Sequence, residues 1–316
     1  MTDALDKGLA QAFGKGLPGE LQLTLKDLFR SPLIGADAER LVFADGTSVP
    51  VRGHVPRFVA DDAYADSFSF QWATFPQTQV DSAQNVQLSE REVHGKANLS
   101  EEVVRGKTIL DAGVGIGRHS EIYARWGGRV IGVDLSGSVD MAYRNLAAFD
   151  NAVVVQADLG DLPFRDGSFD IVSSIGVLHH TPDTKEYARR LVRLLRPGGI
   201  LTVWVYSEKF ARRKQWIPVT SRIPHPAFYD WSVWIVDWLR QDPEHPMFRY
   251  VSQEMDFFFG HSTTDRAVLS LFDGYTPAYH GVHSPTEVSG WFKEFGLTGI
   301  LRGRVETAVF GRKPLG

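Results

Sequence analysis

The stretch Thr108-Ile-Leu-Asp-Ala-Gly-Val-Gly-Ile-Gly-Arg118 decides the fold of this chain. Its apolar start is followed by a carboxylate, Asp111, and then by a glycine at every second position: Gly113, Gly115 and Gly117. This order is typical of a buried parallel strand that turns tightly into the N-terminus of a helix. Because glycine costs conformational entropy, the cluster indicates that a ligand lies against the backbone. The helix would offer free N–H groups and a positive dipole end to an anionic group of that ligand.

Strand-like and helix-like segments alternate after this stretch, which is the signature of a parallel α/β sheet. A mostly helical insertion at 207–284 would interrupt the alternation before the last helix. We therefore expect an α/β fold with a Rossmann-like, mostly parallel sheet of seven strands and helices on both faces. The expected strands are 108–112, 129–135, 152–157, 169–176, 200–206, 297–304 and 307–312, and the expected helices lie near 117–126, 137–148, 183–195 and 285–295.

Composition excludes several classes of function. The 316 residues are 43% hydrophobic and 23% charged, as in ordinary globular proteins. There is no cysteine, which rules out disulfides, thiolate metal sites and a thiolate nucleophile, and we expect no metal. The net charge of −4 argues against a chain-wide surface for nucleic acid. No apolar run approaches the about 18 residues of a membrane span, and Met1 to Glu20 lacks a signal-peptide core, so we expect a cytoplasmic protein.

The ends of the expected strands carry groups that suit a nucleoside. In open α/β sheets, ligands bind at the carboxyl ends of the strands. Asp134 lies 21 residues after Gly113, where a carboxylate can accept hydrogen bonds from both ribose hydroxyls. Asp158 and Leu159 follow the next strand, where an acid can take an adenine amino group and a backbone N–H a ring nitrogen. Each feature alone has a structural explanation, since an aspartate at a strand end is often only a helix cap.

The motifs occur in a characteristic order: Asp-x-Gly-x-Gly-x-Gly at 111–117, Gly-Val-Asp at 132–134, Asp-Leu-Pro-Phe at 161–164, Leu-His-His-Thr-Pro-Asp at 178–183 and Leu-Arg-Pro-Gly-Gly at 195–199. This set resembles the class I S-adenosylmethionine (SAM) methyltransferases, and most of all the branch with ubiquinone and menaquinone C-methyltransferases. The resemblance is close over 105–206 and loose over the two final strands. It implies SAM as cofactor, S-adenosylhomocysteine as product, and cofactor contacts at Asp111, Gly113, Gly115, Gly117, Asp134, Leu135, Asp158, Leu159 and Ile175.

Two segments precede the expected sheet. Residues 29–59 resemble a small zinc-ribbon module found ahead of bacterial methyltransferase domains, with Asp45-Gly46 as a hairpin turn. Ser31 and Ile34 stand where that module has cysteines, so we expect 1–60 to be a ribbon-like segment without metal. It would serve as a docking or oligomerisation module, or as a structural cap. Residues 61–106 resemble a helical connector and lid, in which Gln71 and Trp72 would contact the cofactor unless these aromatics only pack a core.

The resemblance implies methyl transfer to a small molecule through O, N or C. The displacement depends mainly on alignment, and a base is needed only when the nucleophile must lose a proton. His180 and His179 follow the fourth strand and are the first candidates for this base, with His283 as a third; a structural role for the pair stays open. Substrate-pocket residues are expected at Tyr206, Tyr279 and His280.

The insertion is expected to decide specificity, together with the lid. Trp231, Trp234, Ile235 and Trp238 follow helical spacing and indicate an amphipathic helix. That helix would pack on the core, line an apolar pocket or contact a membrane surface, and Phe257–Phe259 repeats the theme. A basic cluster at 209–214 is either a solvated helix face or a partner for a substrate phosphate or carboxylate. The substrate would be apolar, aromatic or sugar-linked.

Three rival functions share parts of this pattern. One is a different reaction of SAM, or SAM binding without catalysis. A second is an NAD-dependent oxidoreductase, which the glycine spacing, Asp158 and Pro197-Gly-Gly disfavour. The third is nucleic-acid methylation, but Ser174-Ile-Gly-Val stands where the Asn/Asp-Pro-Pro-Tyr/Phe motif would be. We therefore expect a small-molecule partner, no nucleic acid and no stable membrane insertion, and we leave a homodimer open.

Overall fold

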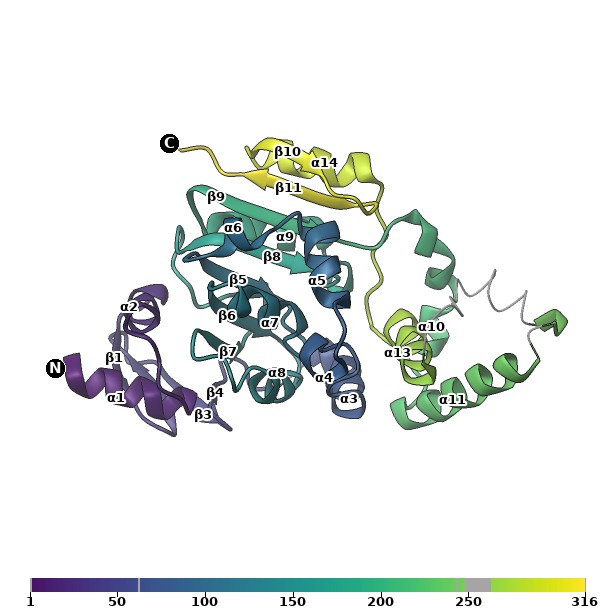
Figure 1. Ribbon diagram of the computed structural model, residues 1–316, viewed down its shortest axis with the longest axis horizontal. Helices are drawn as coiled ribbons and strands as arrows, with labels where there is room; N and C mark the ends of the chain where they lie inside the picture. Colours follow the sequence, from purple (N-terminus) through teal and green to yellow (C-terminus); the bar gives the residue numbers. More distant parts are fainter. Residues whose placement is uncertain (1, 62, 243, 248–262, 316) are drawn as a thin grey trace.

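The computed structural model describes residues 2–61, 63–242, 244–247 and 263–315 (Figure 1). Its centre is a seven-stranded sheet in the order β10-β11-β9-β8-β5-β6-β7. The first five strands along the chain are parallel, whereas β11 pairs antiparallel with β9, and β10 with β11. This confirms the expected α/β class and the mostly parallel sheet. The strands are β5 (Thr108–Ala112), β6 (Arg129–Asp134), β7 (Ala152–Gln156), β8 (Phe169–Ile175), β9 (Leu195–Trp204), β10 (Thr298–Arg302) and β11 (Ala308–Arg312).

Strand β9 begins five residues earlier than the sequence predicts. Leu195 pairs with Phe169 and Ile200 with Ile171, so the residues between form an irregularity in the ladder. Gly198 has a φ of 76°, a left-handed conformation that suits glycine, and Pro197 cannot donate a ladder hydrogen bond. The Arg-Pro-Gly-Gly motif is therefore a bulge inside the strand, and the preceding helix already ends at Arg193.

Helices cover both faces of the sheet because successive side chains of each buried strand point to opposite sides. Leu110 belongs to one apolar cluster and Ile109 to another. Local caps set the helix starts: the Asp183 side chain accepts from the Glu186 N–H, and Ser284 forms a capping box with Glu287. The helices of this part are α7 (Arg118–Arg125), α8 (Val139–Asn145), the 3-10 turn η3 (Leu178–His180), α9 (Thr184–Arg193) and α14 (Pro285–Glu294).

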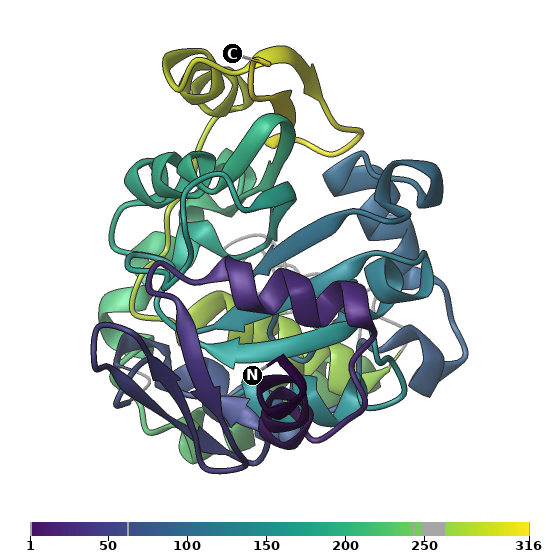
Figure 2. The ribbon, with the colours of Figure 1, turned by 90° about the vertical axis from the view of Figure 1, so that its left-hand side faces the viewer.

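The N-terminal segment completes the core on one face. Leu21, Leu25 and Leu28 of α2 are buried in the same cluster as Leu110 and Val153 of the large sheet. Figure 2 shows this segment in front of the sheet, and the packing is what the structural-cap alternative expects. The segment comprises α1 (Thr2–Phe13), α2 (Gly19–Leu28) and a four-stranded antiparallel sheet of β1 (Leu33–Ala36), β2 (Arg40–Phe43), β3 (Ser48–Arg52) and β4 (Val55–Pro56).

The hairpin predicted at Asp45-Gly46 is confirmed. Gly46 has a φ of 87°, and the Asp45 side chain accepts from the Thr47 N–H at 2.9 Å. The two positions where a zinc ribbon would have cysteines differ: Ser31 Oγ accepts from the Asp45 N–H, and Ile34 is 61% exposed. Within the described residues, no group of three or more histidine, aspartate or glutamate side chains could hold a metal ion.

The connector and the insertion pack against each other. In Figure 1 the insertion lies on the side of the sheet opposite the N-terminal segment. Phe75 of the connector is buried in one apolar cluster with Phe228 and Phe272 of the insertion. The connector comprises η1 (Ala63–Ala65), α3 (Asp66–Thr74), α4 (Asp81–Gln84), α5 (Leu88–Glu92), the π-helical turn η2 (Val93–Ala97) and α6 (Glu101–Val104), and the insertion η4 (Glu208–Gln215), α10 (Ile217–Thr220), α11 (His225–Gln241) and α13 (Thr264–Tyr275).

The buried face of α11 differs from the predicted one. Ile235 is buried, but Trp234 is 58% exposed and stacks on Trp238 at 5.8 Å. The core-facing stripe consists of Phe228, Ser232, Ile235, Val236 and Leu239. The helical spacing of the tryptophans therefore predicted a buried face that is rotated from the one observed. Phe257–Phe259 lies outside the described residues, and no helix within the described ranges is long and apolar enough to cross a membrane.

Candidate functional site

A single cavity lies over the carboxyl ends of the parallel strands. It is lined by the ends of β5, β6 and β8 and by residues of the connector and the insertion. Strand ends form its floor, and the connector and α13 form its walls. Of the residues predicted for the site, those that line it are Gln71, Trp72, Gly113, Gly115, Asp134, Leu135, Leu159, Ile175, His180 and Tyr206.

The three glycines of the turn have different roles. A Cβ at Gly113 would lie 2.2 Å from Val177, and one at Gly117 3.1 Å from Leu146. A Cβ at Gly115 would meet only Trp72 within 4 Å, at 3.5 Å. Gly117, which has a φ of 85° and precedes α7, does not line the cavity. All three glycines have a positive φ, but Gly113 and Gly117 are also required by packing, whereas Gly115 faces the space for a ligand.

Two carboxylates order this turn from below and from the side. Asp111 is buried beneath it and accepts from the Ser120 hydroxyl at 2.7 Å; burial raises its pKa to about 7. Asp134 accepts from the Gly115 N–H at 2.9 Å and from the Ser136 N–H at 2.9 Å. The Ser136 hydroxyl also donates to Asp134 Oδ1 at 2.7 Å, which leaves a lone pair of Oδ2 for a ligand. Of the two carboxylates, only Asp134 lines the cavity.

Asp158 is the predicted cofactor contact that lies just outside the cavity. Its carboxylate accepts from the Gly160 N–H at 2.7 Å. Tyr64 of η1 lines the cavity beside Leu159, and burial raises its pKa. Tyr64, which the sequence did not single out, thus lines the cavity, whereas Asp158 does not.

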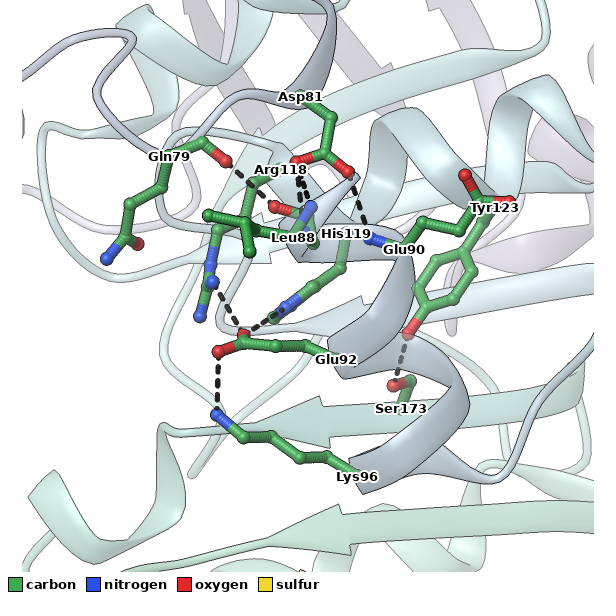
Figure 3. A network of polar contacts seen from close by, with 11 residues as sticks. Gln79, Asp81, Leu88, Glu90, Glu92, Lys96, Arg118, His119, Tyr123 and Ser173 are labelled. Atoms are coloured by element: carbon green, nitrogen blue, oxygen red, sulfur yellow. Dashed lines mark hydrogen bonds and ion pairs between the residues drawn. The ribbon is translucent and has the colours of Figure 1, made fainter. Parts of the chain in front are cut away.

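A charged network closes the cavity on the side of the glycine turn (Figure 3). The Glu92 carboxylate accepts hydrogen bonds from the Arg118 guanidinium at 2.6 Å and from the Lys96 ammonium at 3.0 Å. The Nε2 atom of His119 lies 3.4 Å from the same carboxylate. Burial opposes the charged form of Glu92, but the charges of Arg118 and Lys96 outweigh it and hold its pKa well below the usual range. Burial lowers the pKa of His119 to about 4, so this ring is neutral.

The sequence could have pointed to only one member of this network. Arg118 directly follows the glycine turn, where a ligand was expected. Glu92 and Lys96 have the ordinary i, i+4 spacing of a surface helix pair. Lys96 also lies over the Trp204 ring at 3.8 Å, a cation–π contact that brings η2 against the end of β9. That contact joins residues far apart in the chain, and no local pattern indicates it.

One ring nitrogen of His180 has a hydrogen-bond partner, and the other has none among the described residues. Its Nδ1 lies 3.0 Å from the carbonyl oxygen of Tyr279, and its Nε2 is buried without a partner among the described residues. Burial lowers the pKa of His180, which favours a neutral ring. His179 instead lies beneath the cavity: its Nδ1 accepts from the Tyr206 N–H at 3.2 Å, and its ring stacks on that of Tyr206 at 3.7 Å.

Asp273 of α13 joins the insertion to the core and was not predicted. The Tyr206 hydroxyl donates to its Oδ2 at 2.5 Å, and the Gln71 amide donates to its Oδ1 at 3.4 Å. Asp273 also lines the cavity. One carboxylate therefore connects the end of β9, the connector helix α3 and the insertion at the place where an acceptor would enter.

Three residues predicted for the acceptor end do not line this cavity. His280 donates from Nε2 to the carbonyl of Phe210 at 3.2 Å, and His283 from Nδ1 to Glu287 at 3.0 Å. The Tyr279 side chain is 38% exposed and packs edge-on against Tyr64. Their side chains support the loop before α14, which places them behind the wall of the cavity.

The donor set fits a SAM-like cofactor. Gly115 leaves space beside the backbone, Asp134 offers acceptors for hydroxyls, and Lys96 and Arg118 offer positive charge for a carboxylate at the other end. The arrangement thus matches a molecule with a nucleoside at one end and an amino acid at the other.

Comparisons with known proteins agree with this geometry. Residues 110–203 match the family model described as "Methyltransferase domain". The 2-methyl-6-phytyl-1,4-hydroquinone methyltransferase of Synechocystis sp. is 29% identical over 62% of this chain and 60% of its own length. The demethylmenaquinone methyltransferase of Clavibacter sepedonicus is 36% identical over 33% of this chain and 43% of its own.

The chain also resembles solved structures of methyltransferases. A SAM-dependent methyltransferase from Mesorhizobium loti is 30% identical, covering 36% of this chain and 51% of that one, with a TM-score of 0.32. The chain spans less than two thirds of the length of the curated relatives described above.

Proposed function

Because the chain belongs to the class I SAM-dependent methyltransferase family, we propose that it transfers the methyl group of SAM to a small molecule. The observation that carries this proposal is one continuous cavity with two chemically different ends. Asp134, Leu135 and Leu159 line one end, and His180, Tyr206 and Asp273 line the other. A nucleoside cofactor and a second molecule would therefore meet above the end of β8, beside Ile175.

The residues of the first end would hold the cofactor. Asp134 would accept from the ribose hydroxyls, and Leu135 and Leu159 would enclose the adenine, with Asp158 acting through Tyr187 and Tyr64. Lys96 and Arg118 would hold the carboxylate of the methionine part. When bound, SAM supplies a methyl group already activated by the positive sulfur. Asp111, Gly113 and Gly117 would act indirectly by holding the turn in shape.

The protein would accelerate the transfer mainly by alignment. Holding two reactants in line supplies about 7–11 kcal/mol of a barrier. Gln71 and Trp72 of α3, with α13, would cover the reacting atoms and exclude water. His180 would serve as the base if the nucleophile carries a proton. His179 and His283 are weaker candidates for a base, because both lie outside the cavity.

The relatives support a small-molecule acceptor. The names of two of them specify a hydroquinone and a demethylmenaquinone, which are ring compounds. The aromatic walls around His180 suit such a ring, since Phe68, Trp72, Trp204 and Tyr206 all line the cavity. Methylation at O, N or C is compatible with this arrangement. A homodimer stays a separate proposal, which sedimentation would test.

Isothermal titration calorimetry tests the cofactor assignment against the dinucleotide rival. We expect S-adenosylhomocysteine to bind and NAD to give no heat. Binding of NAD alone would reject the proposal. Incubation with labelled SAM and candidate ring compounds then separates methyl transfer from other reactions: the label must appear in the acceptor, whereas SAM consumption without a labelled acceptor would indicate another chemistry. SAM binding without any consumption would favour a non-catalytic partner.

A further inference from the structure

A second hollow lies beside the charged network drawn in Figure 3. Glu92, Lys96 and Arg118 line the cavity of the candidate site, and the same three residues line this second hollow. Arg91 of α5 and Arg266 of α13 contribute to its remaining wall, so we call it the arginine hollow. The network therefore borders both the cofactor site and the arginine hollow.

The arginine hollow continues into a neighbouring depression. Arg91 and Gly95 line both, and Arg304, between β10 and β11, lines the depression. The Arg304 N–H donates to the Gly95 carbonyl at 3.0 Å, which holds the loop between β10 and β11 against η2. Three arginines from separate segments, Arg91, Arg266 and Arg304, thus meet along one groove. These three are the groove arginines.

The groove is strongly basic, although the chain has a net charge of −4. Among the described residues that line it, Glu92 is the one carboxylate, and it already accepts from Arg118 and Lys96. The lysine and arginine side chains along the groove are Arg91, Lys96, Arg118, Arg266 and Arg304. Like charges that gather in this way repel one another, so an anion among them would be stabilising.

The groove arginines have no ion-pair partner in the described part of the chain. Nearby carboxylates are engaged elsewhere: Glu90 pairs with Arg125 at 2.6 Å, and Glu306 with Lys209 at 3.0 Å. Arg266 also lies in the first turn of α13, where the helix dipole favours acidic side chains. Because local preferences of this kind are broken mainly at functional sites, the unpaired charges indicate a ligand.

The chemistry of the groove favours a phosphate group as this ligand. A guanidinium group binds phosphate oxygens through two parallel hydrogen bonds. A phosphate presents several oxygens and close to two negative charges at neutral pH, so more than one arginine can surround it. A carboxylate has a single charge and two oxygens, which suits the groove arginines less well because they come from three different segments.

We propose that the arginine hollow binds a phosphate-type anion, and that this anion weakens cofactor binding through Arg118 and Lys96. This inference rests on the proposed cofactor site and adds a second, regulatory site beside it. The anion would attract the two cations that hold the methionine carboxylate, so the two negative groups would share the same positive charge. By linkage, the cofactor must weaken binding of the anion by the same factor.

NMR of protein labelled with ¹⁵N at arginine detects the anion without any turnover. Inorganic phosphate, as the probe, should shift the Nε signals of the groove arginines along saturating curves. Each signal is identified by its loss when that arginine is replaced by glutamine. Sodium chloride at equal ionic strength should leave the signals in place, because chloride lacks oxygens for paired hydrogen bonds. Equal shifts with chloride, or shifts that never saturate, would overturn the proposal.

Variants of the groove give a second test. Arg91→Gln and Arg266→Gln should each weaken phosphate binding about fivefold, near the upper limit for one exposed ion pair. Arg52→Gln is the matched control, at an exposed arginine of β3 that lines neither the groove nor the cavity. Without phosphate, all three variants should bind S-adenosylhomocysteine within about twofold of the wild-type affinity. Unchanged phosphate binding in both groove variants would reject the inference.

Calorimetry with S-adenosylhomocysteine tests the coupling. Phosphate should weaken S-adenosylhomocysteine binding by about fivefold and then reach a plateau, since the two ligands occupy different sites. An unchanged affinity would contradict the coupling. A loss that continues without a plateau would mean that phosphate replaces the methionine carboxylate, and would also overturn the proposal. Absence of S-adenosylhomocysteine binding, with the phosphate shifts intact, would reject the proposed function instead.

Glycerol 3-phosphate distinguishes free phosphate from the phosphate group of a larger molecule. If the ligand is free phosphate, glycerol 3-phosphate should bind no more tightly than inorganic phosphate. If the phosphate belongs to a larger molecule, glycerol 3-phosphate should bind more tightly and shift Arg304 further, because Arg304 lines the adjoining depression. Either result supports the site, whereas binding of neither compound would overturn it.

Discussion

The two ends of the cavity are built in different ways. At the cofactor end, Asp111, the glycine turn, Asp134 and Leu159 come from three neighbouring strands within one short part of the chain. At the acceptor end, the hydrogen bond between Gln71 and Asp273 joins residues 202 positions apart. The first end depends on local backbone conformation and the second on the docking of separate segments, so substitutions at the two ends should have separable effects.

The energetic support of the two ends also differs. The strands under the cofactor end are buried on both faces in the two main apolar clusters. The walls of the acceptor end belong to a third cluster, formed by α3, α11 and α13. Tyr206 and Asp273 connect that cluster to the end of β9. The acceptor end is therefore the part expected to rearrange at low energetic cost.

The strongest test of the rigid end is Gly113→Ala. The added Cβ would lie 2.2 Å from Val177 at a φ of 92°, so we expect a loss of about 3 kcal/mol in unfolding free energy. Gly46→Ala is the matched control: its φ is 87°, but nothing lies within 4 Å, and it should cost about 1 kcal/mol. Urea titrations measure both, and equal losses would show that packing against Val177 is unimportant.

Asp134→Ala should separate ligand binding from folding. The carboxylate would accept charge-assisted hydrogen bonds from the cofactor, and their loss should reduce S-adenosylhomocysteine affinity by about 100-fold. Calorimetry gives this value. Tyr206→Phe at the other end of the cavity is the internal comparison and should change this affinity much less. Equal losses of S-adenosylhomocysteine affinity in the two variants would mean that the two ends are not separable.

The pH dependence of stability probes one buried histidine near each end. Burial lowers the pKa of His119 to about 4 and of His280 to about 3, from an ordinary value of 6.5. Between pH 6.5 and these lower values, each histidine binds a proton in the unfolded chain but not in the folded one. The free energy of unfolding therefore falls as the pH falls. Each histidine should lower the free energy of unfolding by about 2 kcal/mol as the pH falls from 7 to 5.

Variants isolate each contribution to this pH dependence. His119→Gln and His280→Gln should each flatten the curve by that amount in urea titrations at the two pH values. The raised pKa of Asp111 acts in the opposite direction, since its protonated form is favoured by folding, so each variant is compared with the wild type. A variant with the slope of the wild type would mean that its histidine is already charged in the fold.

Tyr206→Phe should have the smallest effect. It removes the donor to Asp273 and leaves the carboxylate with one contact fewer, which should cost about 1.5 kcal/mol of unfolding free energy. S-adenosylhomocysteine affinity should stay within about twofold because Tyr206 lies at the acceptor end. Thermal unfolding and calorimetry check the two parts, and a large loss of cofactor affinity would show that α13 also shapes the first end.

Sequence reasoning described the cofactor end better than the acceptor end. Apolar runs in the sequence predict the strand ends at Asp134 and Ile175, and the glycine pattern predicts a close ligand at Gly115. All three residues line the cavity. Asp158 was expected in the cavity but does not line it, whereas Tyr64 of η1 does. Gly117 was expected at the ligand but faces Leu146, a contact set by the packing of α8.

The sequence by itself determined the sheet, the glycine turn and the motif order of the family, because periodicity and turn geometry act between residues close in the chain. Only the tertiary structure decided that Asp273, Glu92 and Lys96 border the cavity and that His280 and His283 do not. It also decided which nitrogen of His180 is open, through the carbonyl of Tyr279. These features depend on segments meeting across long separations, which no local pattern encodes.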